Sequence, residues 1–109
     1  MLQNIRDGSR LTVRLSGELD HYCAQRTRRE LDALIADPGV RTLVLDFSNL
    51  QFMDSSGIGV ILGRYRTMRD RGGSVAVIHM NRHIERIFHM SGMDRIIRQL
   101  DRSQEAADA

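Results

Sequence analysis

The sequence predicts a single α/β domain built on a mixed, mostly parallel β-sheet, with an antiparallel hairpin at the N-terminus and helices packed against the sheet. Early apolar residues alternate around an Asp-Gly turn, later apolar runs are short and nearly continuous, and segments with helical spacing separate these later runs. The chain of 109 residues is long enough for one domain with its own core. We assign residues 1–100 to this domain and residues 101–109, which are polar or small, to a frayed C-terminal tail.

The chain is expected to open with two antiparallel strands. Residues 2–5 and 11–15 are the two apolar-rich runs, and Asp7, Gly8 and Ser9 lie between them. Asp-Gly at this place predicts a tight hairpin turn, because glycine accepts the positive φ angle that such a turn requires.

A helix and a buried strand are expected next. From about Tyr22 the apolar residues fall on one face of a helix, and Asp20 is placed to cap its free amide groups. That face consists of Ala24, Thr27, Leu31, Leu34 and Ile35. Asp-Pro-Gly at residues 37–39 ends the helix. Residues 43–47 form a nearly continuous apolar run, which is typical of a strand covered on both faces.

The remaining segments alternate between helix and strand. A second helix is expected over residues 56–71, a strand over 75–79, a third helix over 82–90 and a last strand over 93–100. The inward face of the second helix is predicted to consist of Ile58, Ile61, Leu62, Tyr65 and Met68. The order is therefore β-β-α-β-α-β-α-β, in which right-handed crossovers join neighbouring parallel strands.

Composition excludes several classes of protein. The longest stretch without charge, around residues 55–63, is far too short for a membrane-spanning helix, and charged residues near the N-terminus argue against a signal peptide. The single Cys23 fits a reducing compartment, so we expect a cytoplasmic protein. All 16 basic residues are arginine, and 14 acidic residues are interspersed with them, which disfavours direct nucleic-acid binding.

The start of the second helix is the most unusual segment. Asp54, Ser55, Ser56 and Gly57 follow one another where free backbone N–H groups and the helix dipole favour anions. A phosphate or phosphoserine would be stable at this position. The simpler interpretation is that Asp54 and Ser55 only cap the helix.

The outer face of the same helix indicates a docking surface. Ser56, Gly59, Val60, Gly63 and Thr67 share one arc of the helical projection and carry no charge. Each glycine lowers helix propensity by about 1 kcal/mol relative to alanine. An uncharged, glycine-rich face is explained if another protein approaches the helix backbone closely.

Chemistry at this helix end is expected to come from a partner. A nucleophilic serine needs a base and an orienting group, and none of the four histidines lies in the serine segment, although His21 could approach Ser55. His79 and His83 are weak candidates for a metal pair. No nucleotide-binding loop motif is present, although a nucleotide or small ligand at the helix end stays open. We therefore predict a binding protein, not an enzyme, with no metal or cofactor of its own.

Three stretches of the chain resemble a known family. Residues 52–65, 17–21 and 90–98 are similar, in order and spacing, to STAS-domain anti-sigma factor antagonists, including those of sporulation. The resemblance covers most of residues 11–98 and implies a single STAS-like domain. Two departures are His21-Tyr22-Cys23 in place of a more polar stretch and a shortened C-terminal helix at residues 103–109.

The resemblance implies a partner-switching regulator of transcription. In such a system the unphosphorylated antagonist binds an anti-sigma factor that is also a serine kinase, and a sigma factor is released. The kinase then phosphorylates the serine after the motif aspartate, here Ser55, and a PP2C-type serine phosphatase reverses the modification. Ser56 is the competing acceptor. The expected partner-binding residues are Asp20, His21, Asp54, Ser55, Ser56, Gly57, Gly59, Val60, Gly63 and Thr67. The alternative is a STAS domain that senses a nucleotide or small ligand.

Overall fold

The computed structural model describes residues 2–100. The elements in chain order are β1 (Gln3–Asp7), β2 (Arg10–Leu19), α1 (His21–Ile35), β3 (Thr42–Met53), α2 (Ser55–Asp70), β4 (Ser74–Ile78), α3 (Arg82–Met90), the 3₁₀ turn η1 (Met93–Arg95) and β5 (Arg98–Gln99). This order confirms the predicted alternation of strands and helices. The tail expected at residues 101–109 lies outside the described residues.

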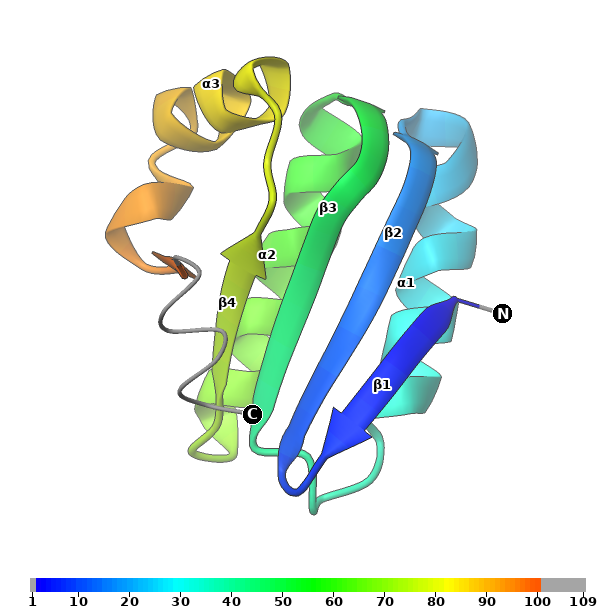
Figure 1. Ribbon diagram of the computed structural model, residues 1–109, viewed down its shortest axis with the longest axis vertical. Helices are drawn as coiled ribbons and strands as arrows, with labels where there is room; N and C mark the ends of the chain where they lie inside the picture. The colour runs from blue at the N-terminus through cyan, green and yellow to red at the C-terminus, as the bar shows by residue number, and fades with distance from the viewer. Residues whose placement is uncertain (1, 101–109) are drawn as a thin grey trace.

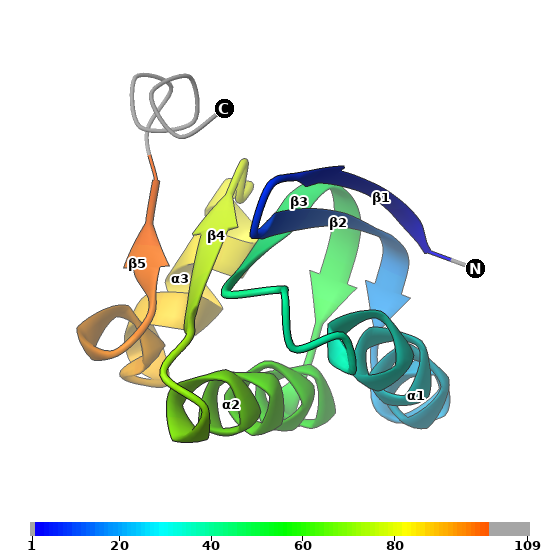
Figure 2. The ribbon, with the colours of Figure 1, turned by 90° about the horizontal axis from the view of Figure 1, so that it is seen from below.

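The sheet has five strands in the order of the chain, β1-β2-β3-β4-β5. β1 pairs with β2 antiparallel, and the other neighbours pair in parallel, which confirms the mixed sheet and its N-terminal hairpin. Helices α1 and α2 lie side by side against one face of the sheet (Figures 1 and 2). Right-handed crossovers between successive strands place the connecting helices on the same side.

The main core lies between the sheet and the helices. β2 contributes Leu11, Val13 and Leu15, which alternate with more exposed residues as a strand with one buried face requires. β3 is buried on both faces over residues 43–47, as predicted. Its Val44 belongs to a second, smaller cluster that also contains Ala76, Ile78 and Leu100.

Helix α2 is rotated relative to the orientation predicted from its sequence. Its buried residues are Gly57, Val60, Ile61, Arg64 and Met68, whereas Ile58, Leu62 and Tyr65 are only partly buried. The predicted outer position of Val60 is therefore wrong, since this side chain is 6% exposed. The cause is that α2 packs against both the sheet and α1, so its buried stripe faces the corner between them.

The strand predicted over residues 93–100 is also wrong in most of its length. Gly92, with a φ angle of 81°, leads instead into η1, and the backbone N–H groups of Ile96 and Ile97 donate to the carbonyl of Met93 at 3.1 and 2.8 Å. Residues 93–97 are therefore turned and cannot belong to an extended strand. Only Arg98 and Gln99 then pair with β4.

None of the helices within residues 2–100 combines the length and apolar character needed to cross a membrane.

Candidate functional site

Helices α1 and α2 begin next to each other at one edge of the sheet. Leu19 and Met53, the last residues of β2 and β3, pair with each other in the parallel register. Asp20 and Asp54 are the next residues, and the Asp54 N–H donates to the Leu19 carbonyl at 3.4 Å. Both helices therefore start from the same edge, at the top of Figure 1.

Both helix ends are capped by aspartate. Asp20 accepts hydrogen bonds from the backbone N–H groups of Tyr22 and Cys23, each at 3.0 Å, as predicted for this residue. The bond from the Cys23 N–H is the main cause that holds the pKa of the Asp20 carboxyl below its usual value. Asp54 accepts from the N–H groups of Ser56 at 2.8 Å and Gly57 at 3.4 Å. The capping interpretation of Asp54 is therefore correct, and the neighbouring serine remains available.

Ser55 is the first residue of α2 and is exposed to solvent. Ser56, the competing acceptor, is half-buried and lines a groove between the helices. The Asp54 carboxylate accepts from the N–H groups of Ser56 and Gly57. Because Ser55 is exposed, a group added to its hydroxyl would be accessible to solvent at the positive end of the helix dipole.

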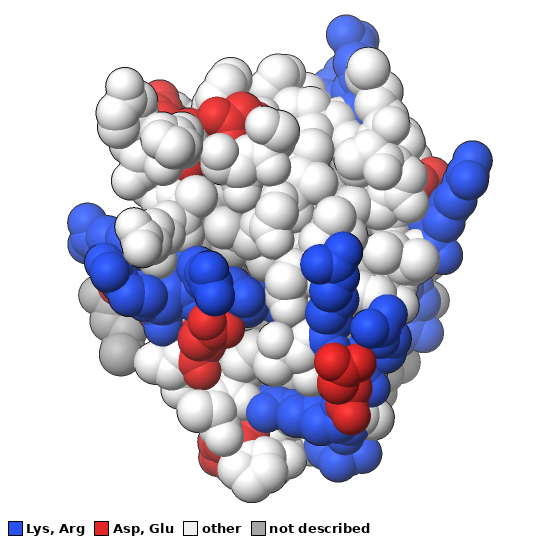
Figure 3. All heavy atoms as spheres, turned by 180° about the vertical axis from the view of Figure 1, so that it is seen from behind, with Lys and Arg blue, Asp and Glu red and all other residues white. Residues whose placement is uncertain are grey.

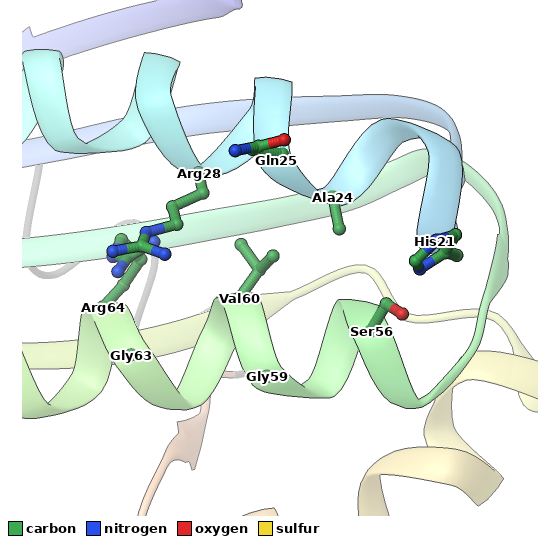
Figure 4. A pocket seen from close by; sticks show the side chains of 9 residues that line it. All are labelled: His21, Ala24, Gln25, Arg28, Ser56, Gly59, Val60, Gly63 and Arg64. Carbon is green, nitrogen blue, oxygen red and sulfur yellow. The ribbon is translucent and has the colours of Figure 1, made fainter.

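The groove between α1 and α2 has a volume of about 580 Å³ (Figure 4). It is lined by His21, Ala24, Gln25, Arg28, Ser56, Gly59, Val60, Gly63 and Arg64. A Cβ atom built on Gly59 or on Gly63 would meet no atom within 4 Å apart from its chain neighbours and the helix's own backbone, so α2 is open to an approaching molecule at both positions. The open backbone at both glycines agrees with the expectation that another protein can approach this helix closely.

Gly57 differs from these two glycines. A Cβ atom at this position would lie 2.5 Å from the Leu19 carbonyl oxygen and 2.5 Å from Cγ of Met53. Gly57 is therefore needed for the close packing of α2 on β2 and β3. Gly57 and Val60 are both buried in the free chain, and their expected place among the partner-contacting residues stays a prediction.

The other expected residues are at least partly accessible. His21, Ser55, Gly59 and Thr67 are exposed, and Asp20, Asp54, Ser56 and Gly63 are half-buried. The structure therefore groups Asp20, His21, Asp54 and Ser55 around the two helix ends and Ser56, Gly59 and Gly63 along the groove. Thr67 lies one turn further on, where its hydroxyl donates to the Gly63 carbonyl at 3.1 Å.

Residues 2–107 match the STAS domain family model. The chain belongs to the STAS domain family. This STAS domain is 47% identical over 87 residues to an anti-sigma F factor antagonist of Paenibacillus polymyxa, a match that covers 80% of this chain and 74% of the relative. It is 34% identical over 83 residues to an anti-sigma F factor antagonist of Lysinibacillus sphaericus, over 76% of this chain and 71% of the relative.

Solved structures show the same fold. The STAS domain matches the anti-sigma factor antagonist SpoIIAA in its unphosphorylated form with a TM-score of 0.81 and 29% identity, over 99% of this chain and 94% of that chain. It matches SpoIIAA, a Bacillus cell fate determinant, in the phosphorylated form with a TM-score of 0.73 and 29% identity, over 99% and 97% of the two chains. The STAS-like fold expected from the sequence is confirmed.

Sequence reasoning missed four residues near the site of this STAS domain. Tyr22 is 90% exposed at the start of α1, and Phe52, 41% exposed, stacks on His83 with ring centroids 5.7 Å apart. Arg28 and Arg64 line the groove from opposite helices. The sequence offered two signals for these residues. Tyr22 lies outside the apolar stripe of the first helix, and Arg64 follows directly after Gly63.

Replacing the cap of α2 tests its role in the STAS domain fold. Asp54→Ala is expected to lower the free energy of unfolding by about 1 kcal/mol, because the N–H groups of Ser56 and Gly57 lose their acceptor. Asp54→Asn keeps an acceptor oxygen and is expected to cost much less. Urea denaturation of both variants measures the difference, and an equal loss in the two would show that the charge of Asp54, not its hydrogen bonds, stabilises the helix end.

Proposed function

We propose that this STAS domain is an anti-sigma factor antagonist that binds an anti-sigma factor while Ser55 is unphosphorylated. Binding would release a sigma factor, and phosphorylation of Ser55 would end the binding. The observation that carries the proposal is the exposed Ser55 at the start of α2, beside the start of α1 and an open groove. The relatives named as anti-sigma F factor antagonists support the same role.

We define the contact surface as the accessible members of the expected set: Asp20, His21, Asp54, Ser55, Ser56, Gly59, Gly63 and Thr67. On the helix-bearing face most arginine side chains gather on the lower half, whereas the upper half is mostly uncharged, with acidic side chains toward its left and basic ones at its right margin (Figure 3). Apart from the capping carboxylates of Asp20 and Asp54, the residues of this surface carry no formal charge, and open glycines suit close contact with another protein.

Phosphorylation of Ser55 changes the charge of this surface more than its shape. The phosphoryl group adds about −1.5 to −2 charges next to Asp54. The helix dipole tolerates the added charge in the free protein. A partner that covers Ser55 would have to desolvate the charge, and a buried charge left without a partner costs about 3 to 5 kcal/mol. Release therefore needs no change of fold.

Ser55 acts in this scheme as a substrate. Its hydroxyl oxygen forms the new bond to the γ-phosphorus of ATP, the bond to the leaving ADP breaks, and the hydroxyl proton passes to a base of the kinase. ATP and Mg²⁺ belong to the anti-sigma factor, which serves as the serine kinase, and a PP2C-type serine phosphatase removes the group. The STAS domain itself has no catalytic role in these steps, and we place them in the cytoplasm in a sporulation pathway.

The position of the phosphate tests this proposal. Incubation with the cognate anti-sigma factor and Mg-ATP is expected to add one phosphoryl group, and mass spectrometry of peptides is expected to place it on Ser55. Ser56→Ala should still be phosphorylated and Ser55→Ala should not. Modification of Ser56 alone, or of Ser55→Ala to the wild-type extent, would contradict the assignment.

A further inference from the structure

A buried guanidinium forms part of the groove wall. Arg64 of α2 is 6% exposed, and its side chain extends toward α1 at the end of the groove away from His21 and Ser56 (Figure 4). Its Nε lies 3.0 Å from Oδ1 of Asp32, but within residues 2–100 neither Nε nor Nη1 has a hydrogen-bond partner of good geometry. Burial is the main cause that lowers the pKa of this guanidinium. Arg64 is therefore a mostly buried cation whose charge is countered by Asp32 through an ion pair without good hydrogen-bond geometry.

The charges around Arg64 do not balance. Asp32 also lies 3.8 Å from Nε of Arg28, one turn earlier on α1, so a single carboxylate serves two guanidinium groups. Arg28 has a side chain that is 63% exposed and can adjust to an incoming group. We call Arg28, Asp32 and Arg64 the cationic end of the groove, and its formal charge is positive.

We propose that the cationic end of the groove binds an acidic side chain, aspartate or glutamate, of the anti-sigma factor. This inference rests on the proposed function and adds the chemistry of the partner's contact. A carboxylate matches the planar fork of a guanidinium and can accept from Arg64 and Arg28 together. A basic side chain would be repelled, and an apolar one would bring no acceptor to the two guanidinium groups that share Asp32.

The position of the cationic end would also orient the partner. His21 and Ser56 line the other end of the groove, next to Ser55, while open backbone at Gly59 and Gly63 separates the two ends (Figure 4). A carboxylate fixed at Arg64 and Arg28 would set how the partner lies along the groove. With the carboxylate held at one end of the groove, the same part of the partner would always lie over Ser55 at the other end.

Charge substitutions with opposite expected signs test the proposal. Calorimetric titration with the cognate anti-sigma factor is expected to show about tenfold weaker binding for Arg28→Gln and for Arg64→Lys, which keeps the charge but loses the fork. Asp32→Asn is expected to bind about threefold more tightly, because it removes the competing carboxylate. Arg66→Gln, an exposed position of α2 outside the groove lining, is the matched control and should bind as wild type does.

Three results would overturn the inference. The first is wild-type affinity of Arg28→Gln for the anti-sigma factor, and the second is weaker binding by Asp32→Asn. The third is micromolar binding of ATP or GTP to the isolated chain that Arg28→Gln abolishes, because this result would show that the groove binds a nucleotide. If Arg64→Lys fails to fold in a thermal scan, Arg28→Gln and Asp32→Asn decide the question. If the wild-type chain does not bind the anti-sigma factor at all, the proposed function fails and this inference with it, a result distinct from the other three.

Discussion

Ser55→Asp is expected to weaken binding of the anti-sigma factor by at least about a hundredfold while leaving thermal unfolding nearly unchanged. Ser55 is exposed at the first turn of α2, where a negative charge is compatible with the helix dipole, so the free protein should lose no stability. The cost arises when the partner covers the carboxylate and removes its water. Titration calorimetry and a thermal scan of the same sample measure the two quantities.

Ser9→Asp is the control for added charge. Ser9 is also exposed, but it lies in the turn between β1 and β2, at the opposite end of the sheet from the starts of α1 and α2. This variant should bind as tightly as wild type, and Ser55→Ala should bind but resist release by the kinase. Equal weakening by Ser9→Asp and Ser55→Asp would show a general effect of net charge instead of a charge under the partner.

Gly57→Ala is expected to lower the free energy of unfolding by about 3 kcal/mol. The new methyl group would lie 2.5 Å from the backbone oxygen of Leu19 and 2.5 Å from Cγ of Met53, so β2 or α2 would have to shift. The Leu19 oxygen is fixed in the sheet, since Leu19 pairs with Met53 in the register of β2 and β3. Urea denaturation followed by circular dichroism measures the loss.

Gly59→Ala, one half-turn along the same helix, is the matched control with the opposite expected sign. A Cβ atom there meets no neighbour within 4 Å, so the substitution should raise the free energy of unfolding by up to about 1 kcal/mol through helix propensity. Similar stability of the Gly57→Ala and Gly59→Ala variants would contradict the distinction between a glycine that permits packing and one that leaves the backbone open.

Local patterns were sufficient for much of this fold. The Asp-Gly turn predicted the β1-β2 hairpin, Asp20 was recognised as the cap of α1, and the helix expected over residues 82–90 has the observed bounds. In each case the signal lies within a few neighbouring residues, because turn geometry and capping hydrogen bonds are made locally.

Features that depend on packing between distant segments could not be obtained in this way. The helical projection of α2 assumed a single neighbour, whereas contact with α1 buries Val60 and Arg64 and turns the glycines toward a groove. Asp20 and Asp54 come to the same edge of the sheet because Leu19 pairs with Met53, and no local sequence pattern encodes this register. Residues 93–100 were predicted as one full strand, whereas most of them form the turn around η1. This turn depends on how the chain returns from α3 to pair with β4, which the local sequence does not show.

The affinity of the anti-sigma factor for one sample of this protein, measured before phosphorylation, after phosphorylation on Ser55 and after removal of the phosphate, tests the central claim most directly. We predict tight binding in the first state, a loss of at least about a hundredfold in the second, and full recovery in the third, with the same circular dichroism spectrum throughout. Equal affinity in the phosphorylated and unphosphorylated states would contradict the account.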